Sequence, residues 1–297
     1  MKALRVLGWS VAGLVAVLGL VALAVIVLSQ RKYERTLDIK VAPVAYVDAA
    51  EAVARGKYLF ESRGCAECHG NDGAGRVFIE NGASMRARSP NITRGPGSVV
   101  TGYKEVDWVR TIRHGVKPDG RPILIMPSED YNRLTDADLA ALVAYTRALP
   151  PASGTAAEFT LPFIFKAMYV AGVVTDAPER IDHSLPPAQP VAEQANAAHG
   201  AYVANMCLGC HGARLTGGKI PGGPPDWPAA ADLTPASAVM KSYDSVDKFK
   251  SMLRTGKAPD GRALQVMPFS TLKQLNDTDV EALYLYLKAL PTASAKG

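Results

Sequence analysis

The chain has little net charge beyond its first residues, and this excludes several functions. Its formal net charge is +5, but +4 of this lies within the first 35 residues, on both sides of an apolar run. The remainder therefore lacks the basic stripe that nucleic-acid binding requires. It also lacks a kinase-like or DNA-binding segment that would receive a signal, which argues against a sensor. A length of 297 residues suits about two domains.

Long hydrophobic runs are also scarce, and the single clear one spans Val6 to Leu28 without a charge. A helix of about 20 such residues crosses the hydrocarbon core of a bilayer. A cleaved signal peptide has a shorter apolar region, of roughly 7–15 residues. The small-residue pattern Ala22-Leu23-Ala24 fits a cleavage site, but it lies inside the run. We therefore expect residues 1–30 to form an uncleaved transmembrane anchor, followed by a linker over 31–47.

Only four cysteines are present, and they form two Cys-x-x-Cys pairs, each followed directly by a histidine. Two disulfides, a redox-active pair or a zinc site are alternative interpretations of such pairs. The added histidine favours haem attachment, in which two thiols bond to the vinyl groups and the imidazole binds the iron. We expect two covalently bound haem c groups, held by Cys65, Cys68 and His69 and by Cys207, Cys210 and His211.

The chain after residue 48 repeats itself. His69 and His211 are 142 positions apart, and the Met-Pro pairs that begin at Met126 and Met267 are 141 apart. This near-constant step predicts two copies of one domain, over 48–150 and 191–297. The connector over 151–190 contains an apolar stretch, 163–170, that is too short for a second membrane span. We expect this stretch to pack between the two domains.

Each copy is predicted to be mostly helical, so the expected fold class is all-α. The first helix covers about 49–63 or 191–206, and the middle helix about 106–114 or 246–255. Thr135 and Asn276 are good N-caps for the last helix. Gly56 and Gly200 recur in the first helix and mark a close crossing with the last helix.

The sixth iron ligand has to be identified separately. A methionine thioether is a soft ligand that raises the reduction potential and closes the iron to substrates. Met126 and Met267 occupy equivalent positions, 57 and 56 residues after their histidines, and each precedes a proline. His114 is the competitor in the first domain, but its equivalent is Thr255. We therefore predict Met126 and Met267 as ligands and expect His114 to be a partly exposed residue at a helix end.

Several further residues are candidates with weaker support. Two pairs of equivalent arginines, Arg113 with Arg254 and Arg121 with Arg262, are candidates for binding the haem propionates. The equivalent segments 91–93 and 232–234 are candidates for lining a haem edge. The arginines at 76, 86, 88 and 94 occur only in the first domain, where a solvated loop is favoured over a docking surface.

These motifs together resemble class I cytochrome c domains. The resemblance rests on Cys-x-x-Cys-His, Pro90-Asn91-Ile92-Thr93, Arg113-His114-Gly115, Met126-Pro127 and the segment 134–139. More narrowly, the chain is similar to multi-haem cytochrome c subunits of periplasmic membrane-bound alcohol, aldehyde and gluconate dehydrogenases. Such subunits commonly carry three haem domains and a terminal membrane-associating segment. This chain differs in having two repeats and an N-terminal apolar run.

The resemblance implies an electron-transfer protein rather than an enzyme. The expected partner is a periplasmic dehydrogenase subunit or another redox protein, with electrons passing from it, or from a quinol, toward a respiratory acceptor. The expected location is the bacterial inner membrane, with one membrane pass and the haem domains in the periplasm. A di-haem cytochrome c peroxidase is the alternative, although a methionine on both irons argues against the open coordination position that a peroxidase needs.

Overall fold

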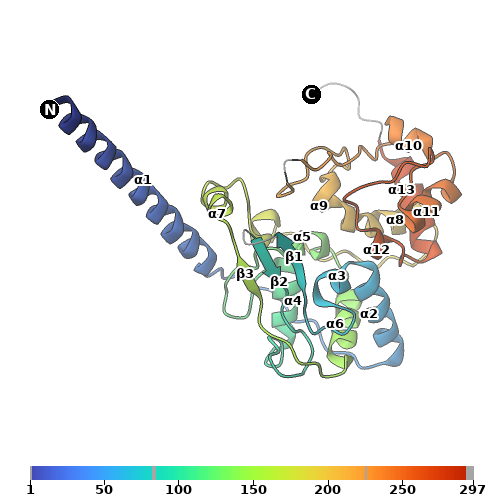
Figure 1. The fold of residues 1–297 in the computed structure, drawn as a ribbon. Helices are drawn as coiled ribbons and strands as arrows, with labels where there is room; N and C mark the ends of the chain where they lie inside the picture. Colours follow the sequence, from blue (N-terminus) through green and yellow to red (C-terminus); the bar gives the residue numbers. More distant parts are fainter. Residues whose placement is uncertain (1, 82–84, 225, 292–297) are drawn as a thin grey trace.

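The computed structural model describes residues 2–81, 85–224 and 226–291 of the chain. A long N-terminal helix, α1 (Lys2–Glu34), projects from two helical domains (Figure 1). Among the described residues, α1 is the one helix long and apolar enough to cross a membrane. The basic residues Arg31 and Lys32 occupy its last turn, where they complement the negative end of the helix dipole.

The first domain is built from five helices around one apolar core. Leu59 and Phe60 of the first helix pack with Trp108 of the middle helix and with Leu139 and Leu142 of the last helix. The helices are α2 (Ala50–Ser62), α3 (Cys65–His69), α4 (Glu105–His114), α5 (Ser128–Tyr131) and α6 (Asp136–Ala148).

The second domain repeats this arrangement around its own core. Phe249 and Leu253 pack with Val280 and Leu283, and Met240 is fully buried in the same core. Its elements are α8 (Ala197–Val203), the 3-10 helix η2 (Ala204–Cys207), α9 (Leu208–His211), α10 (Ala238–Ser242), α11 (Val246–Thr255), α12 (Phe269–Leu272) and α13 (Asp277–Ala289). The predicted all-α class is thus confirmed, and α10 is an added helix in this copy.

The predicted crossing of the first and last helices is confirmed in both domains. A Cβ atom on Gly56 would overlap the carbonyl group of Ala141, and one on Gly200 would overlap that of Ala282. The predicted N-caps are confirmed as well. The Thr135 hydroxyl accepts a 3.0 Å hydrogen bond from the amide of the third helical residue, and the Asn276 side chain accepts the equivalent bond at 2.7 Å.

A small antiparallel sheet, formed by two strands of the first domain and one strand of the connector, was not foreseen from the sequence. Its strands are β1 (Val77–Asn81), β2 (Met85–Arg88) and β3 (Glu158–Thr160), in the order β1-β2-β3. The expectation of a solvated arginine loop is wrong for this segment, because Arg86 and Arg88 belong to β2. Arg86 lies 3.4 Å from Glu158 of the neighbouring strand, and Ala87 is fully buried.

The apolar stretch 163–170 of the connector was expected to pack between the domains, and this expectation is wrong. Its helix α7 (Phe163–Val170) packs against α1 instead, as Figure 1 shows. The physical reason is a polar cluster at the end of α1, where Arg35 forms two bonds to the buried carboxylate of Asp176, at 2.6 and 2.9 Å. The short 3-10 helix η1 (Ala177–Arg180) follows this anchor point.

Candidate haem-attachment sites

The attachment motif is helical in both domains: it forms α3 in the first domain, and it crosses from the end of η2 into α9 in the second. In the first domain α3 begins at Cys65 and ends at His69, and it is bounded by Gly64 and Gly70, which both have positive φ angles, of 83° and 76°. Residues three and four positions apart share one helix face, so both thiols and the imidazole lie on the same side of the turn. All four cysteines are free thiols, which excludes the disulfide interpretation in this structure.

The zinc interpretation also finds no support. Within the described ranges, no three His, Cys, Asp or Glu side chains converge in a group that could hold a metal ion by themselves. A haem iron does not need such a group, because the porphyrin supplies four of its ligands.

Both histidine rings are held by a backbone carbonyl in the same way. The Nδ1 atom of His69 lies 3.1 Å from the carbonyl oxygen of Pro90, and that of His211 lies 2.8 Å from the carbonyl oxygen of Ala231. A carbonyl only accepts, so Nδ1 carries the proton and Nε2 keeps its lone pair for a metal. Burial lowers the pKa of both histidines, which keeps the rings neutral.

The loops that supply these carbonyls are themselves fixed by repeated hydrogen bonds. The side chain of Asn91 accepts from the amide of Thr93 at 2.8 Å, and Asp232 accepts from Thr234 at 2.8 Å. Each such Asx-turn immediately follows the residue whose carbonyl accepts from the histidine. The equivalent segments 91–93 and 232–234 therefore fix the carbonyls that contact His69 and His211 by the same means in the two domains.

The predicted methionine ligands lie at the margins of the two cores. Met126 borders the core of the first domain together with Cys65 and Ile92. Met267 borders that of the second domain together with Cys207 and Leu233. Each domain therefore brings an attachment thiol, an aliphatic loop residue and the predicted methionine to one apolar core. This set of side chains suits a flat, largely apolar macrocycle bonded at one edge.

The competing ligand His114 has another partner. It is only 7% exposed, so the expectation of a partly exposed residue is wrong, although it does end helix α4. Its Nδ1 atom lies 3.0 Å from Nδ1 of the connector residue His183. Burial and the neighbouring histidine lower the pKa of His114 to about 4. Met240 and Met252, which lack repeat equivalents, are buried core residues.

The candidate propionate ligands bind protein groups. Arg113 donates to the carbonyl of Leu134 at 2.6 Å, and Arg254 donates to the equivalent carbonyl of Leu275 at the same distance. Both arginines also pair with the first acidic residue of the last helix, at 2.8 and 3.2 Å. They tie the middle helix to the start of the last helix, while Arg121 and Arg262 pair with neighbouring exposed aspartates.

Each attachment turn also contacts the other domain. The amide of Gly209, inside the second motif, donates to the carboxylate of Asp130 at 3.0 Å, and the hydroxyl of Thr271 donates to Glu67, inside the first motif, at 3.3 Å. Asp130 and Thr271 are repeat equivalents that follow the two Met-Pro pairs. Burial, followed by the charge of Glu129, raises the pKa of Asp130 to about 7.

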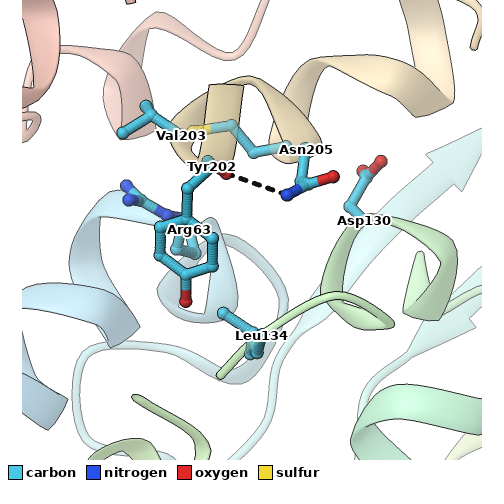
Figure 2. Close-up of a pocket in the computed structure, with 7 residues that line it drawn as sticks. Arg63, Asp130, Leu134, Tyr202, Val203 and Asn205 are labelled. Carbon is cyan, nitrogen blue, oxygen red and sulfur yellow. Dashed lines mark hydrogen bonds between the residues drawn. The ribbon is translucent and has the colours of Figure 1, made fainter. Parts of the chain in front are cut away.

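Two tyrosines make shorter reciprocal contacts between the domains. Tyr58 of α2 donates to Asp279 of α13 at 2.7 Å, and Tyr202 of α8 donates to Asp138 of α6 at 2.7 Å. Each hydroxyl also accepts from the N-cap amide of that helix, at 3.1 Å for Tyr58 and 3.3 Å for Tyr202. Figure 2 shows Tyr202 reaching from the second domain toward Leu134 of the first, beside Arg63.

The acidic residues at this interface are buried and paired. Asp279 has no exposed surface, and it accepts from Arg63 at 2.9 Å and lies 2.7 Å from His199. Burial would raise the pKa of this carboxyl, but the charge of Arg63 and the hydrogen bonds hold it below its usual range. The contacts repeat with the two domains exchanged, as in an isologous dimer interface. They hold the two attachment turns in a fixed relation.

The sequence interpretation missed the role of these tyrosines. The signal was present, because Gly-x-Tyr recurs at 56–58 and 200–202, and an aspartate recurs four residues after Leu134 and Leu275. The repeat did not reveal that each tyrosine binds the aspartate of the opposite domain.

Comparison with known proteins agrees with the two-domain organisation. Residues 51–145 match the family model described as cytochrome c oxidase, cbb3-type, subunit III. Residues 196–291 match the family model described as cytochrome c.

The relatives that match most of this chain include cytochrome subunits of three dehydrogenases. The chain is 26% identical to the fructose dehydrogenase cytochrome subunit of Gluconobacter japonicus over 83% of its length and 54% of that protein. It is 27% identical to the alcohol dehydrogenase (quinone) cytochrome c subunit of Gluconobacter oxydans, over 82% and 56% of the two chains. For the gluconate 2-dehydrogenase cytochrome c subunit of Pantoea cypripedii the identity is 26%, over 82% and 60%.

The chain thus spans little more than half the length of these relatives. Its neutral, carbonyl-held histidines, its free thiol pairs and both family matches point to the same cofactor. The chain therefore carries two cytochrome c domains, each implying one covalently bound haem c, and is homologous to cytochrome c subunits of fructose, alcohol and gluconate dehydrogenases.

Proposed function

We propose that this protein is a membrane-anchored di-haem cytochrome that accepts electrons from a periplasmic dehydrogenase, or from a quinol, and passes them toward a respiratory acceptor. The observation that carries this proposal is the pair of equivalent sites, each with a neutral histidine held by a backbone carbonyl and a methionine at the margin of the same core. The similarity to dehydrogenase cytochrome subunits supports the choice of donor.

Haem supplies one-electron redox chemistry when it is bound. In this proposal Cys65, Cys68, Cys207 and Cys210 would attach the two groups, and His69 and His211 would each bind one iron. Met126 and Met267 would supply the second protein ligand of each iron, which would close it to small ligands. The domain boundaries proposed from the repeat are 48–150 and 191–297, with the anchor over 1–30.

The proposed topology places the N-terminus in the cytoplasm and both domains in the periplasm. Helix α1 is long and apolar enough for the single pass. The basic residues at both of its ends do not decide the orientation. The attachment motifs favour the outer side, because haem is joined covalently to bacterial c-type cytochromes on that side of the membrane.

Methionine ligation separates the carrier from the peroxidase alternative. The ferric wild-type protein should show the weak charge-transfer band of a methionine-ligated iron near the red end of the spectrum. The reduced protein should bind carbon monoxide slowly or not at all. Met126→Ala should open one haem and Met267→Ala the other, and each should lower the potential of that haem. Met168→Ala, in the connector, is the control and should leave both spectra unchanged.

The peroxidase alternative would replace the carrier proposal if the wild-type protein bound cyanide or peroxide rapidly and reduced hydrogen peroxide with electrons from a reduced donor.

The proposed partner is tested separately. The native complex should be purified from membranes under mild detergent and its other subunits identified. A dehydrogenase that reduces both haems on addition of its substrate is the expected result.

A further inference from the structure

The connector helix α7 is fixed to the end of the apolar helix α1. The ammonium group of Lys32 donates to the carbonyl of Tyr169 at 2.9 Å and lies 4.4 Å from the centre of its ring. Arg35 donates to the Tyr169 hydroxyl at 3.1 Å and pairs with the buried carboxylate of Asp176. Because Tyr169 is only 3% exposed, this joint sets where α7 lies relative to α1.

The contact continues along α1 into its apolar segment. Ser29 is only 7% exposed. The exposed large apolar residues of α1, in contrast, have exposed fractions of 40% or more. Ala22, Val25 and Lys32 are partly buried and fall on the same helix face as Ser29. Helix α7 therefore lies beside the last turns of the segment that ends at Leu28, at the level where a spanning helix would leave the hydrocarbon.

Three large apolar side chains of α7 and of the turn that follows it are left uncovered by the protein. Phe163 is 49% exposed and Ile164 is 65% exposed, and Val173 in the following turn is 70% exposed. Outside α1, Ile164 and Val173 are the most exposed large apolar residues in the described part of the chain. Over residues 163–173 the only charged side chain is that of Lys166.

We propose that α7 and the turn after it insert into the lipid–water boundary of the membrane, as a second membrane contact beside α1. The geometry favours the bilayer as the partner that covers this apolar surface, because the surface adjoins the end of the spanning segment. A single cation and no acidic group suit an interface with anionic headgroups. This contact sets the height and tilt of the first domain above the membrane. The proposal rests on the proposed membrane crossing of α1.

The test uses the full chain, loaded with haem and reconstituted into vesicles of phosphatidylcholine with anionic phosphatidylglycerol. The four native cysteines are bonded to haem, so one introduced cysteine can carry a nitroxide label. Labels are placed in separate variants at Ile164→Cys and Val173→Cys. Leu18→Cys, in the middle of α1, reports the anchor, and Val239→Cys, 39% exposed in α10, is the water-facing control.

Collision of each label with oxygen, which concentrates in lipid, is compared with collision with a water-soluble nickel complex. Oxygen collisions should dominate at positions 18, 164 and 173, and nickel collisions should dominate at 239. Nickel-dominated collisions at 164 and 173 with a lipid-embedded position 18 would overturn this proposal alone. Low collision with both reagents at 164 would overturn it in favour of a protein neighbour. A water-exposed position 18 would instead refute the membrane anchor itself.

Discussion

The reciprocal tyrosine contacts make a quantitative prediction about how the two domains hold each other. Tyr58→Phe removes a 2.7 Å hydrogen bond to the buried carboxylate of Asp279 and the acceptor of the Asn276 amide. A hydrogen bond to a charged group contributes about 1.5–3 kcal/mol, and an unsatisfied buried donor adds a further penalty. We expect Tyr58→Phe to lower the free energy of unfolding by about 2–3 kcal/mol.

Tyr202→Phe removes the equivalent 2.7 Å bond to Asp138. Its second bond, to the amide of Thr135, is longer at 3.3 Å, so the expected loss is slightly smaller, about 1.5–3 kcal/mol. At this chain length either loss corresponds to a fall in melting temperature of about 4–10 °C.

The matched controls are Tyr145→Phe and Tyr286→Phe. These residues are also repeat equivalents, but their hydroxyl groups form no hydrogen bond with the described residues. Urea unfolding of the full chain in mild detergent is followed by far-ultraviolet circular dichroism and by haem absorbance. The controls should change the free energy by less than about 0.5 kcal/mol. If Tyr58→Phe and Tyr202→Phe change it no more than the controls, the reasoning about the interface is wrong.

Two further predictions concern the first domain. Gly56→Ala should lower the free energy of unfolding by about 2 kcal/mol or more, because the new Cβ would overlap a carbonyl of α6. The control Gly102→Ala, at a position with open space around it, should be nearly neutral. Both variants are compared with the wild type by thermal unfolding. Burial lowers the pKa of His114 from 6.5 to about 4 in the folded protein. Between pH 6.5 and pH 4 the unfolded chain therefore binds one proton that the folded chain does not bind. The free energy of unfolding should fall as the pH falls through this range. The measurement is the decrease in the free energy of unfolding between pH 7 and pH 4. This decrease should be smaller in His114→Gln than in the wild type, by up to about 3 kcal/mol. An unchanged pH profile would contradict the buried, neutral state of His114.

The features that the sequence predicted well depend on local rules or on the repeat. Helix ends at Thr135 and Asn276 follow from capping within one turn. The close crossings at Gly56 and Gly200 followed from a glycine recurring at equivalent helix positions. The attachment turns were predictable because two thiols and an imidazole have to lie within one turn to hold a haem.

The features that were missed depend on residues far apart in the chain. Strand β3 pairs with β2 although about 70 residues separate Arg86 from Glu158, and neither segment has a clear strand pattern. The connector position depends on Arg35 reaching Asp176, which no local periodicity indicates. The tyrosine contacts exchange partners between the domains, and a repeat reveals equivalence without revealing such an exchange.

The most direct test of the account is the mass of the denatured, reduced full-length protein, produced in cells that attach haem c outside the cytoplasm. Each of the two motifs should retain its cofactor through two thioether bonds after unfolding. The account predicts a polypeptide mass increased by two haem groups, falling to one for the paired variant Cys65→Ser/Cys68→Ser and equally to one for Cys207→Ser/Cys210→Ser. A wild-type mass with one haem group or none would contradict it.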